Sequence, residues 1–549
     1  MKPFLDAGGL GRQRPKSLGF LLKWKYLAVI AGLVYISYCF VFNLPIFAHP
    51  LPKHTGPYAV GAIDIEAPAS PARNVDPNIR FKHAQHNNPA QPFQLDTVLF
   101  TLYYPATYAD AKSSRVRRHP WIPHPIPLRA KGYARAAHIS NWLTDSIFTG
   151  AIKALVGSIT IPAAVDVPLS DHATREAKHP TAFWRNKHVD QQVLESPKAG
   201  GHPIIIFSHG TVSSRTDYSH YAGELAARGY VVAMLEHRDG SSPGSIVMTK
   251  GSDKERTVLL FDESEVETLA GGPVSVEDFH KSQLLFREAE IEEVVRILQD
   301  INAGEGSKIF EQNSRNEGND LTNWTGRLNT EGMIISGHSY GATGALQALR
   351  GGPENPRRPF KGGLILDPGK SSGPLNEDIS VPLLIVHSNT WSSKSSLFYG
   401  GRAHFDTVKS IVEANNDRGH PSWFMTSLGT SHPSVTDAPL LEPLLLSFTT
   451  GATIDVYQGL RQYVHVAEDF LGFVVGDGQT RGLLAEKAEF PQYDGGMGLG
   501  VWKPGQEGAS HKERKKREEK VKERGEWWDW RKYWQVHVSP VGDGAKEKE

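Results

Sequence analysis

Residues 333–350 read MIISGHSYGATGALQALR, in which the serine pattern Gly-x-Ser-x-Gly lies between an apolar run and a run with helical periodicity. The apolar run Met333–Ser336 predicts a buried strand, and Ala342–Arg350 predicts a helix. A serine at a sharp turn from strand to helix projects its hydroxyl above the edge of the sheet. The sequence therefore predicts that Ser339 is a catalytic nucleophile.

The same pattern occurs twice more, but neither copy has this setting. GSSPG at residues 240–244 has Pro243 directly after its serine, and proline has no backbone N–H to donate to an oxyanion. GKSSG at residues 369–373 is followed by Pro374 and a loop. Because glycine and serine are frequent in this chain, the pattern is informative only between a strand and a helix.

Short apolar runs and helical runs alternate through the middle of the chain. The apolar runs are Val98–Tyr103, Pro203–Ser208, Tyr230–Glu236, Met333–Ser336, Gly363–Leu366, Pro382–His387 and Trp423–Leu428. The helical runs are Asp217–Arg228, Ser282–Ile301, Ala342–Arg350 and Arg402–Asn415. Continuous apolar runs such as PIIIFS are typical of parallel strands that are buried on both faces. The alternation predicts an α/β fold with a mostly parallel central sheet between two layers of helices.

The composition excludes several classes of protein. The 549 residues include 60 basic and 60 acidic side chains, so the chain lacks the basic excess of a domain built to bind nucleic acid. Its single cysteine, Cys39, excludes a disulfide framework, cysteine-ligated zinc and iron–sulfur clusters. None of the usual metal-ligand spacings occurs, so we expect neither a metal nor another cofactor.

A serine hydroxyl becomes a nucleophile when a base takes its proton and a carboxylate orients that base. In the α/β-hydrolase order, the acid and then the histidine follow the serine. Asp367 ends the next predicted strand, in GGLILDPG, and is the predicted acid. Glu377 and Asp378 are competing carboxylates, but both lie in a loop away from a strand end.

The predicted base is His432, which lies in the segment SLGTSHPS after the last predicted strand. Two other histidines compete with it. His387 ends an earlier strand and His420 precedes the last one. We therefore expect both of them to have structural roles.

The tetrahedral intermediate of ester hydrolysis needs two N–H donors that point at its oxyanion. Tyr340, directly after the nucleophile, is one predicted donor. Thr211 is the other, because HGTVSS follows the predicted strand PIIIFS. His209 in the same segment is interpreted as a packing residue.

These motifs are part of a longer similarity that runs from about Gly56 to Val475. It includes the segments GPYAVGAIDI, TLYYPA, GSITIPAAVDVPL, IIIFSHG with RTDYS, AARGYVVAMLEHRDGS, GHSYGATGAL, GGLILDPG, GTSHPSVTD and ATIDVYQGLRQYVHVAEDFLG. In them the chain resembles the platelet-activating factor acetylhydrolases of the serine-dependent, calcium-independent phospholipase A2 type. It looks like a fungal-style, membrane-anchored member of that family.

The resemblance implies an α/β-hydrolase fold and places the triad on Ser339, Asp367 and His432. It places the oxyanion donors on Thr211 and Tyr340, where Leu and Phe are familiar. It implies hydrolysis of a short or oxidised acyl ester at the middle glycerol position of a phospholipid, typically the acetyl group of 1-alkyl-2-acetyl-glycerophosphocholine. Pro368 after the acid departs from the familiar pattern.

Two other functions remain open at the level of the sequence. One is a broader carboxylesterase or neutral lipase with the same triad. The other is a catalytically inactive hydrolase fold that serves as an adhesion or scaffold domain. Such domains usually lose a triad residue, and all three are present here, so an enzyme is favoured.

The longest apolar run, Tyr26–Phe47, predicts an uncleaved transmembrane signal-anchor. A basic leader at residues 1–25 precedes it, which keeps the N-terminus cytosolic and predicts a luminal or extracellular catalytic domain. The alternative is a signal peptide that is cleaved near Ala48, which would give a secreted protein. Asn323 lies in the sequon Asn-Trp-Thr and is a glycosylation candidate.

Around this core the sequence predicts a linker at 48–55, a catalytic domain at 56–475, a Gly-rich linker at 476–511 and a charged, Trp-containing tail at 512–549. The tail is expected to be a solvated helix or disordered, and its tryptophans also fit an anchor in a membrane interface. Within the catalytic domain, residues 66–95 are interpreted as a polar insertion and residues 136–158 as a lid.

Apolar side chains recur at near-helical spacing in this lid. Among them, Trp142, Phe148 and Leu155 are candidates for contact with a lipid surface, which a water-insoluble substrate would require. A helix that packs onto the body is the other interpretation. The expected partners are therefore a phospholipid substrate and a lipid membrane.

Overall fold

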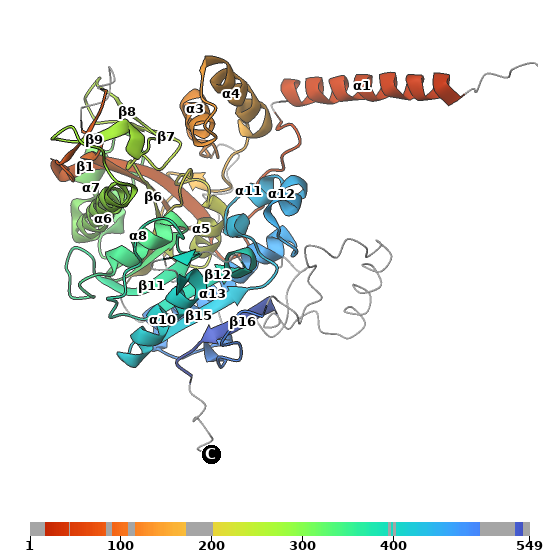
Figure 1. Ribbon diagram of the computed structural model, residues 1–549. Coiled ribbons are helices and arrows are strands. Elements are labelled where there is room, and N and C mark those ends of the chain that lie inside the picture. Colours follow the sequence, from red (N-terminus) through yellow and green to blue (C-terminus); the bar gives the residue numbers. More distant parts are fainter. Residues whose placement is uncertain are drawn as a thin grey trace, which may run out of the picture.

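The computed structural model describes residues 17–42, 44–83, 91–107, 116–171, 201–393, 397–398, 402–494 and 533–541. Within these residues, one ten-stranded sheet forms the centre of the catalytic domain (Figure 1). In order across the sheet, the strands are β16 (Trp534–Val538), β15 (Ser422–Ser427), β12 (Leu383–Ser388), β11 (Phe360–Leu366), β10 (Leu328–His338), β5 (His202–Ser208), β6 (Val231–Glu236), β3 (Gln94–Ala106), β1 (Ala59–Asn74) and β4 (Ala164–Val165).

The middle of this sheet is parallel, from β15 through β12, β11, β10 and β5 to β6. Antiparallel pairs flank it, between β15 and β16 on one side and among β6, β3 and β1 on the other. Three short antiparallel pairs accompany the sheet: β2 (Ile79–Phe81) with β9 (Val266–Thr268), β7 (Gly244–Val247) with β8 (Arg256–Leu259), and β13 (Leu397–Phe398) with β14 (Arg402–Ala403).

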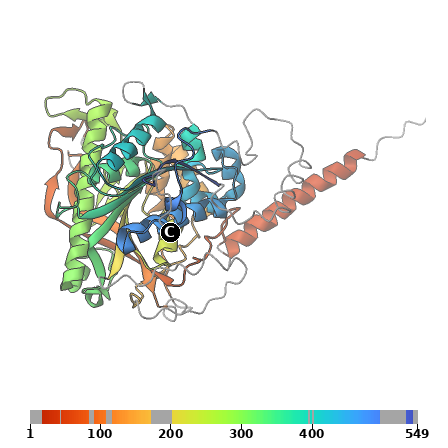
Figure 2. The same ribbon diagram turned by 90° about the horizontal axis from the view of Figure 1, so that it is seen from below.

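Helices cover both faces of the sheet (Figure 2). They are α5 (Ser219–Ala226), α6 (Val276–Asp300), α8 (Tyr340–Ala348), α10 (His404–Asp417) and α13 (Val456–Gly472). Further helices of this domain are α7 (Gly306–Gln312), α9 (Asn389–Ser393), α11 (Ala438–Leu441) and α12 (Pro443–Thr450).

Alternate residues of each central strand belong to two different apolar cores. In β5, Ile204 and Ile206 pack in the core that contains α6, α8 and α10. Ile205 and Phe207 pack in the core that contains α5 and α13. A strand that is buried on both sides needs apolar residues at every position, which explains the continuous apolar runs. The predicted α/β-hydrolase architecture with a mostly parallel sheet is thus confirmed.

All of the predicted strand and helix runs correspond to elements of the structure. The strands that sequence reasoning missed, β1, β4 and β16, lie toward the two edges of the sheet. The proposed insertion at 66–95 begins inside β1 and ends inside β3, which pair with each other. Within that interval residues 84–90 lie outside the described residues.

Segments on both sides of the predicted domain at 56–475 pack against it, whereas the sequence suggested that they were linkers and a tail. In the linker at 48–55, Ala48 and Leu51 are buried, and the His49 N–H donates to the Leu441 carbonyl (2.8 Å). Past residue 475, Leu484 is buried and its carbonyl accepts from Trp423 Nε1 (3.0 Å). In the tail, β16 adds a strand to the sheet, whereas residues 495–532 and 542–549 lie outside the described residues.

The apolar run near the N-terminus forms helix α1 (Ser17–Val41), which extends away from the domain (Figure 1). The helix ends before the run does, because Pro45 cannot continue it. Among the described residues, no helix is both long and apolar enough to cross a membrane. The predicted span at residues 26–47 is therefore not supported.

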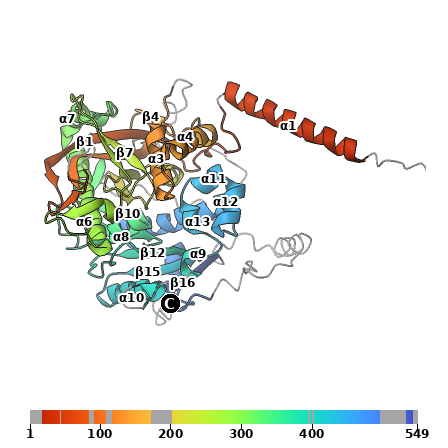
Figure 3. The ribbon, with the colours of Figure 1, turned by 45° about the horizontal axis from the view of Figure 1, so that its top comes forward.

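The segment predicted to be a lid contains the end of helix α3 (Ile126–Ala136) and all of helix α4 (Trp142–Val156), which lie side by side (Figure 3). Asn141 caps α4, because its side chain accepts from the N–H groups of Leu143 and Thr144 (3.0 and 3.1 Å). No residue of α4 is fully buried, so much of the helix faces solvent.

Candidate active site

Ser339 lies at the turn between β10 and α8, with φ 57° and ψ −122°. Positive φ is unfavourable for a residue with a Cβ atom and costs about 1–3 kcal/mol. The flanking glycines make the turn possible. A Cβ at Gly337 would lie 2.3 Å from the Gly341 carbonyl oxygen, and one at Gly341 would lie 1.9 Å from the Ser208 carbonyl oxygen. The strained turn holds the Ser339 hydroxyl above the carboxyl edge of the sheet.

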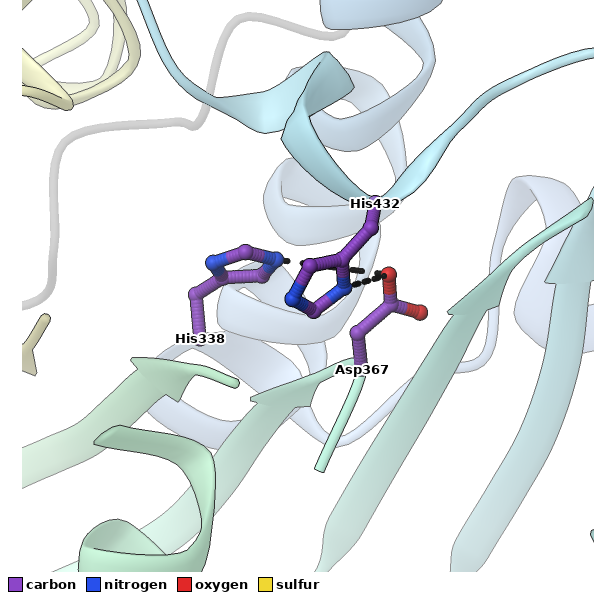
Figure 4. A group of neighbouring side chains, drawn as sticks. All are labelled: His338, Asp367 and His432. Carbon is purple, nitrogen blue, oxygen red and sulfur yellow. Dashed lines mark hydrogen bonds and ion pairs between the residues drawn. The ribbon is translucent and has the colours of Figure 1, made fainter. Parts of the chain in front are cut away.

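The structure brings His432 and Asp367 to this serine (Figure 4 shows the histidine and the carboxylate). His432 Nε2 lies 3.1 Å from Ser339 Oγ, and His432 Nδ1 lies 2.9 Å from Asp367 Oδ2. Asp367 follows β11 directly, whereas His432 begins a short turn after β15. The competing carboxylates Glu377 and Asp378 are not the ones bonded to His432.

The carboxylate of Asp367 is also held in place by Ser388. It accepts hydrogen bonds from the Ser388 N–H (2.5 Å) and the Ser388 hydroxyl (2.7 Å). An acceptor fixed at Nδ1 keeps the proton of neutral His432 on that nitrogen. His432 Nε2 is then free to accept the proton of Ser339, as general-base catalysis requires.

The His432 ring is in contact with two other rings. Trp391 in α9 stacks on it, with the ring centroids 3.9 Å apart and the planes 11° from parallel. Trp391 Nε1 donates to the carbonyl of Pro368, the residue after Asp367 (3.0 Å). This hydrogen bond fixes the Trp391 ring, which in turn packs against His432. Trp391 was not predicted from the sequence, because no local pattern marks it.

His338 also contacts His432, with their ring centroids 4.4 Å apart (Figure 4). Its Nδ1 hydrogen-bonds with the Tyr218 hydroxyl (2.9 Å). Burial, with a smaller effect from His432, holds the pKa of His338 well below its ordinary value. A neutral His338 does not repel the positive charge that His432 gains when it accepts a proton.

The predicted oxyanion donors flank the serine. The Tyr340 N–H is in the first turn of α8, where amides have no partner within the helix. Thr211 is exposed in the loop after β5, and a Cβ at neighbouring Gly210 would lie 3.1 Å from the Cβ of Ser339. Both predicted donors therefore belong to segments that lie next to Ser339.

Arg287 of α6 contacts both of the segments that carry the predicted donors. Its buried guanidinium donates to the carbonyl of His209 (2.8 Å), to Ser241 Oγ (2.6 Å) and to Asp239 Oδ2 (2.7 Å). The Ser241 carbonyl accepts in turn from the N–H of Val212, next to Thr211 (2.7 Å). The same guanidinium lies over the ring of Tyr340, 4.3 Å from its centroid. One side chain, which sequence reasoning missed, thus contacts the ring of Tyr340 and the loop that carries Thr211.

A second hydrogen-bonded serine, histidine and carboxylate array lies below the oxyanion loop. Ser208 Oγ is 2.7 Å from His237 Nε2, and His237 Nδ1 is 2.6 Å from Glu290 Oε2. All three side chains are fully buried, so no ester can reach this serine. His209 is also buried, as expected for a packing residue, and accepts from the His237 N–H (3.1 Å). The array is therefore a structural support for the loop.

We expect Arg287→Met to lower kcat/KM about 100-fold with KM changed less than threefold, because displaced N–H donors weaken the transition state rather than substrate binding. A trifluoromethyl ketone that mimics the tetrahedral adduct should lose affinity in parallel. Arg296→Met, on the same helix but paired with Glu293 and Asp300, is the matched control. Wild-type kcat per titrated active site would contradict this role, whatever the change in thermal stability.

Two groups of side chains within the described residues offer metal-ligand atoms within 4.8 Å of one another: His338, Asp367 and His432, and Asp64, His119 and Glu317. In the first group, both ring nitrogens of His432 already serve the triad. In the second, Arg215 binds Asp64 (2.6 Å) and Arg117 binds Glu317 (2.8 Å), which neutralises the charge that a cation would need. The hydrogen bonds account for both groups without a metal.

The remaining predicted residues lie away from the triad. Asn323 is exposed in a turn at Leu321–Trp324, and its Nδ2 donates to Asp320 Oδ1 (2.6 Å). On α4, Trp142 is 80% exposed and Leu155 39% exposed, whereas Phe148 is half-buried.

Comparisons with known proteins identify the family of this chain. Residues 185–477 match the family model described as platelet-activating factor acetylhydrolase, isoform II. A platelet-activating factor acetylhydrolase from Cavia porcellus is 27% identical over 357 residues, which cover 63% of this chain and 62% of that protein. A putative phospholipase A2 from Schizosaccharomyces pombe is 31% identical over 158 residues, which cover 28% of this chain and 35% of that protein. The chain thus matches less than two thirds of the length of these relatives.

Among solved structures, a ferulic acid esterase from Streptomyces cinnamoneus has a TM-score of 0.45 and 15% sequence identity, with 81% of this chain and 96% of that chain covered. The family model covers more than half of this chain and includes Ser339, Asp367 and His432. The chain therefore belongs to the platelet-activating factor acetylhydrolase family of isoform II type.

Proposed function

We propose that this protein is a serine esterase that hydrolyses the short acyl ester at the middle glycerol position of a phospholipid, typically the acetyl group of 1-alkyl-2-acetyl-glycerophosphocholine. The observation that carries the proposal is the chain of contacts from Ser339 through His432 to Asp367, at 3.1 and 2.9 Å, on a strained turn beside two amide donors. Membership of the acetylhydrolase family supports the choice of substrate.

In the first half of the reaction, Ser339 Oγ attacks the ester carbonyl while His432 Nε2 takes its proton. The oxyanion forms between the amides of Thr211 and Tyr340, and the Asp367 carboxylate stabilises the imidazolium. Collapse of the intermediate breaks the ester bond, and His432 returns the proton to the lyso-lipid alkoxide. In the second half, water attacks the acyl-serine with His432 as base, which releases the carboxylic acid and regenerates Ser339.

A series of phosphocholines tests the substrate class. We expect kcat/KM to be highest for an acetyl group at the second position and to fall as that chain lengthens to butanoyl and palmitoyl. Higher activity on tributyrin than on the acetyl phospholipid would instead favour a broad carboxylesterase. A wild-type protein that fails to react with a fluorophosphonate probe would favour an inactive scaffold.

The apolar side chains of α4 are proposed to contact the lipid surface on which such a substrate resides. Trp142, Leu143 and Ile147 are 80%, 49% and 59% exposed. Trp142 presents a large amphipathic ring of the kind enriched at lipid–water boundaries. Because Phe148 is half-buried, it is the least exposed of the three residues that the sequence suggested.

Replacing both Trp142 and Ile147 by Ser should weaken binding to phosphatidylcholine vesicles at least tenfold, since two exposed apolar groups no longer enter the interface. Hydrolysis of a water-soluble acetyl ester should stay unchanged. Leu285→Ser removes a comparable exposed side chain from α6 and should not alter vesicle binding. Unchanged binding of the double variant would show that α4 is not the contact.

A further inference from the structure

A cavity of about 430 Å³ lies between α3, β3, β7 and the loop that follows β5. One part of its wall is cationic, formed by Arg129, Arg215 and Arg315, and another is apolar, formed by Leu99, Ile246 and Met248. Its volume is in the range of sites for small organic molecules. The three triad residues do not line it, so the cavity is separate from the catalytic site.

The positive charge around this cavity exceeds the negative charge. Four guanidinium groups share three buried carboxylates, which leaves one unit of positive charge. The ion pairs are Arg129 with Glu236 (2.7 Å), Arg215 with Asp64 (2.6 Å), and both Arg238 and Arg315 with Glu66 (2.6 Å each). Nearby, Glu317 is already offset by Arg117 and by His119, which also borders the cavity (2.8 and 2.9 Å).

Two of the arginines have buried N–H groups without a hydrogen-bond partner among the described residues. Arg129 is only 3% exposed, and its Nη1 has no hydrogen-bond partner within the described residues. The Nε of Arg315 is in the same situation. Burial lowers the pKa of Arg315, and Arg215 and Arg238 add to that effect although Glu66 opposes it. Buried donors of this kind are normally satisfied, so their presence in a cavity wall indicates an acceptor from outside the chain.

We propose that this cavity binds the carboxylate of a short- or medium-chain fatty acid. The carboxylate oxygens accept from Arg129 and Arg315 in charge-assisted hydrogen bonds, and the hydrocarbon chain contacts Leu99, Ile246 and Met248. A fatty-acid carboxylate is favoured over a bare inorganic anion because Leu99, Ile246 and Met248 offer contact to a hydrocarbon chain. The choice of a fatty acid rests on the proposed function, since ester hydrolysis releases one.

The cavity is connected to the catalytic site through the loop that follows β5. Arg215 and Thr216 line the cavity and belong to the same loop as Thr211. The Arg215 N–H also donates to Glu236, the carboxylate that binds Arg129 (3.1 Å). The ligand therefore lies against the loop that carries one oxyanion donor.

Calorimetry with hexanoate tests the proposal in full-length protein carrying Ser339→Ala, in which no turnover occurs. We expect one hexanoate to bind, with affinity at least tenfold lower when Arg315→Met is added. This second change is mild for folding, because Glu66 keeps its contact with Arg238. Arg135→Met, on α3 but paired with Glu265 outside the cavity, is the matched control and should leave the affinity unchanged.

Three outcomes would overturn the assignment. An affinity for hexanoate that Arg315→Met leaves unchanged would show that the ligand binds elsewhere, including in the acyl pocket of the catalytic site. Binding of 1-hexanol as tight as that of hexanoate would exclude a role for the charge. Inorganic phosphate binding as tightly as hexanoate would exclude the apolar contacts. Because these are binding measurements, their failure is distinct from a failure of the protein to hydrolyse phospholipids.

Discussion

Ser339→Ala should reduce ester hydrolysis by about 10⁴-fold or more and abolish labelling by a fluorophosphonate. The substitution removes the atom that forms the acyl-enzyme, and residues of a triad act as one unit, so little activity can remain. The protein should stay folded, because alanine keeps the backbone and removes only the contact from Ser339 Oγ to His432 Nε2. Active-site titration and kcat/KM on an acetyl phosphocholine measure the effect.

The motif GKSSG at residues 369–373 offers a matched control. Ser371 is the central serine of GKSSG and is exposed, so Ser371→Ala should leave both labelling and turnover at the wild-type level. Labelling that survives in the Ser339 variant, or that disappears in the Ser371 variant, would show that the nucleophile belongs to another motif.

Asp367→Asn should lower kcat by roughly 10³- to 10⁴-fold with a small change in KM. An amide can present an N–H₂ group to His432 Nδ1, which favours the tautomer with its proton on Nε2. That tautomer cannot accept the proton of Ser339. The asparagine side chain of this variant would have one acceptor oxygen where the Asp367 carboxylate has two. It therefore cannot accept from the Ser388 N–H, the Ser388 hydroxyl and His432 together, and the His432 ring loses its fixed orientation.

The pH dependence and a neighbouring carboxylate separate this effect from general damage. Asp378→Asn, in the exposed loop that follows, should retain wild-type kcat and the wild-type pH profile. Asp367→Asn should change the pH profile of kcat/KM, because that profile reports the pKa of the base. An Asp367→Asn variant with near wild-type kcat would show that another group orients His432.

Several parts of the fold could be predicted because their causes are local. The run PIIIFS is apolar at every position, which only a strand buried on both faces requires, and it is β5. GHSYG follows a strand and precedes a helix, and its glycines are needed because a Cβ at either position would lie within 2.3 Å of a backbone atom. Asp367 and His432 follow strand ends, and parallel strands end at one edge of the sheet, so both residues meet Ser339.

Other elements depend on pairing partners that are distant in the chain. β16 lies in a segment that reads as a charged tail, yet its backbone completes the edge of the sheet beside β15. β1 crosses the start of what the sequence suggested was an insertion, because it pairs with β3 along most of its length. Conversely, the apolar run at Tyr26–Phe47 predicted a membrane span, whereas no helix among the described residues is both long and apolar enough to be one.

The sequence alone was enough to predict the α/β sheet, a serine at a strand-to-helix turn, and a carboxylate and a histidine in hydrolase order. These features follow from short-range patterns. Burial, backbone strain and strand ends each require particular residue types at neighbouring positions of the chain. Only the tertiary structure decided what holds the site in place and what lies beside it. Arg287, Trp391 and the arginine-lined cavity act through contacts between residues far apart in the chain, and the spacing along one strand or helix carries no trace of such contacts.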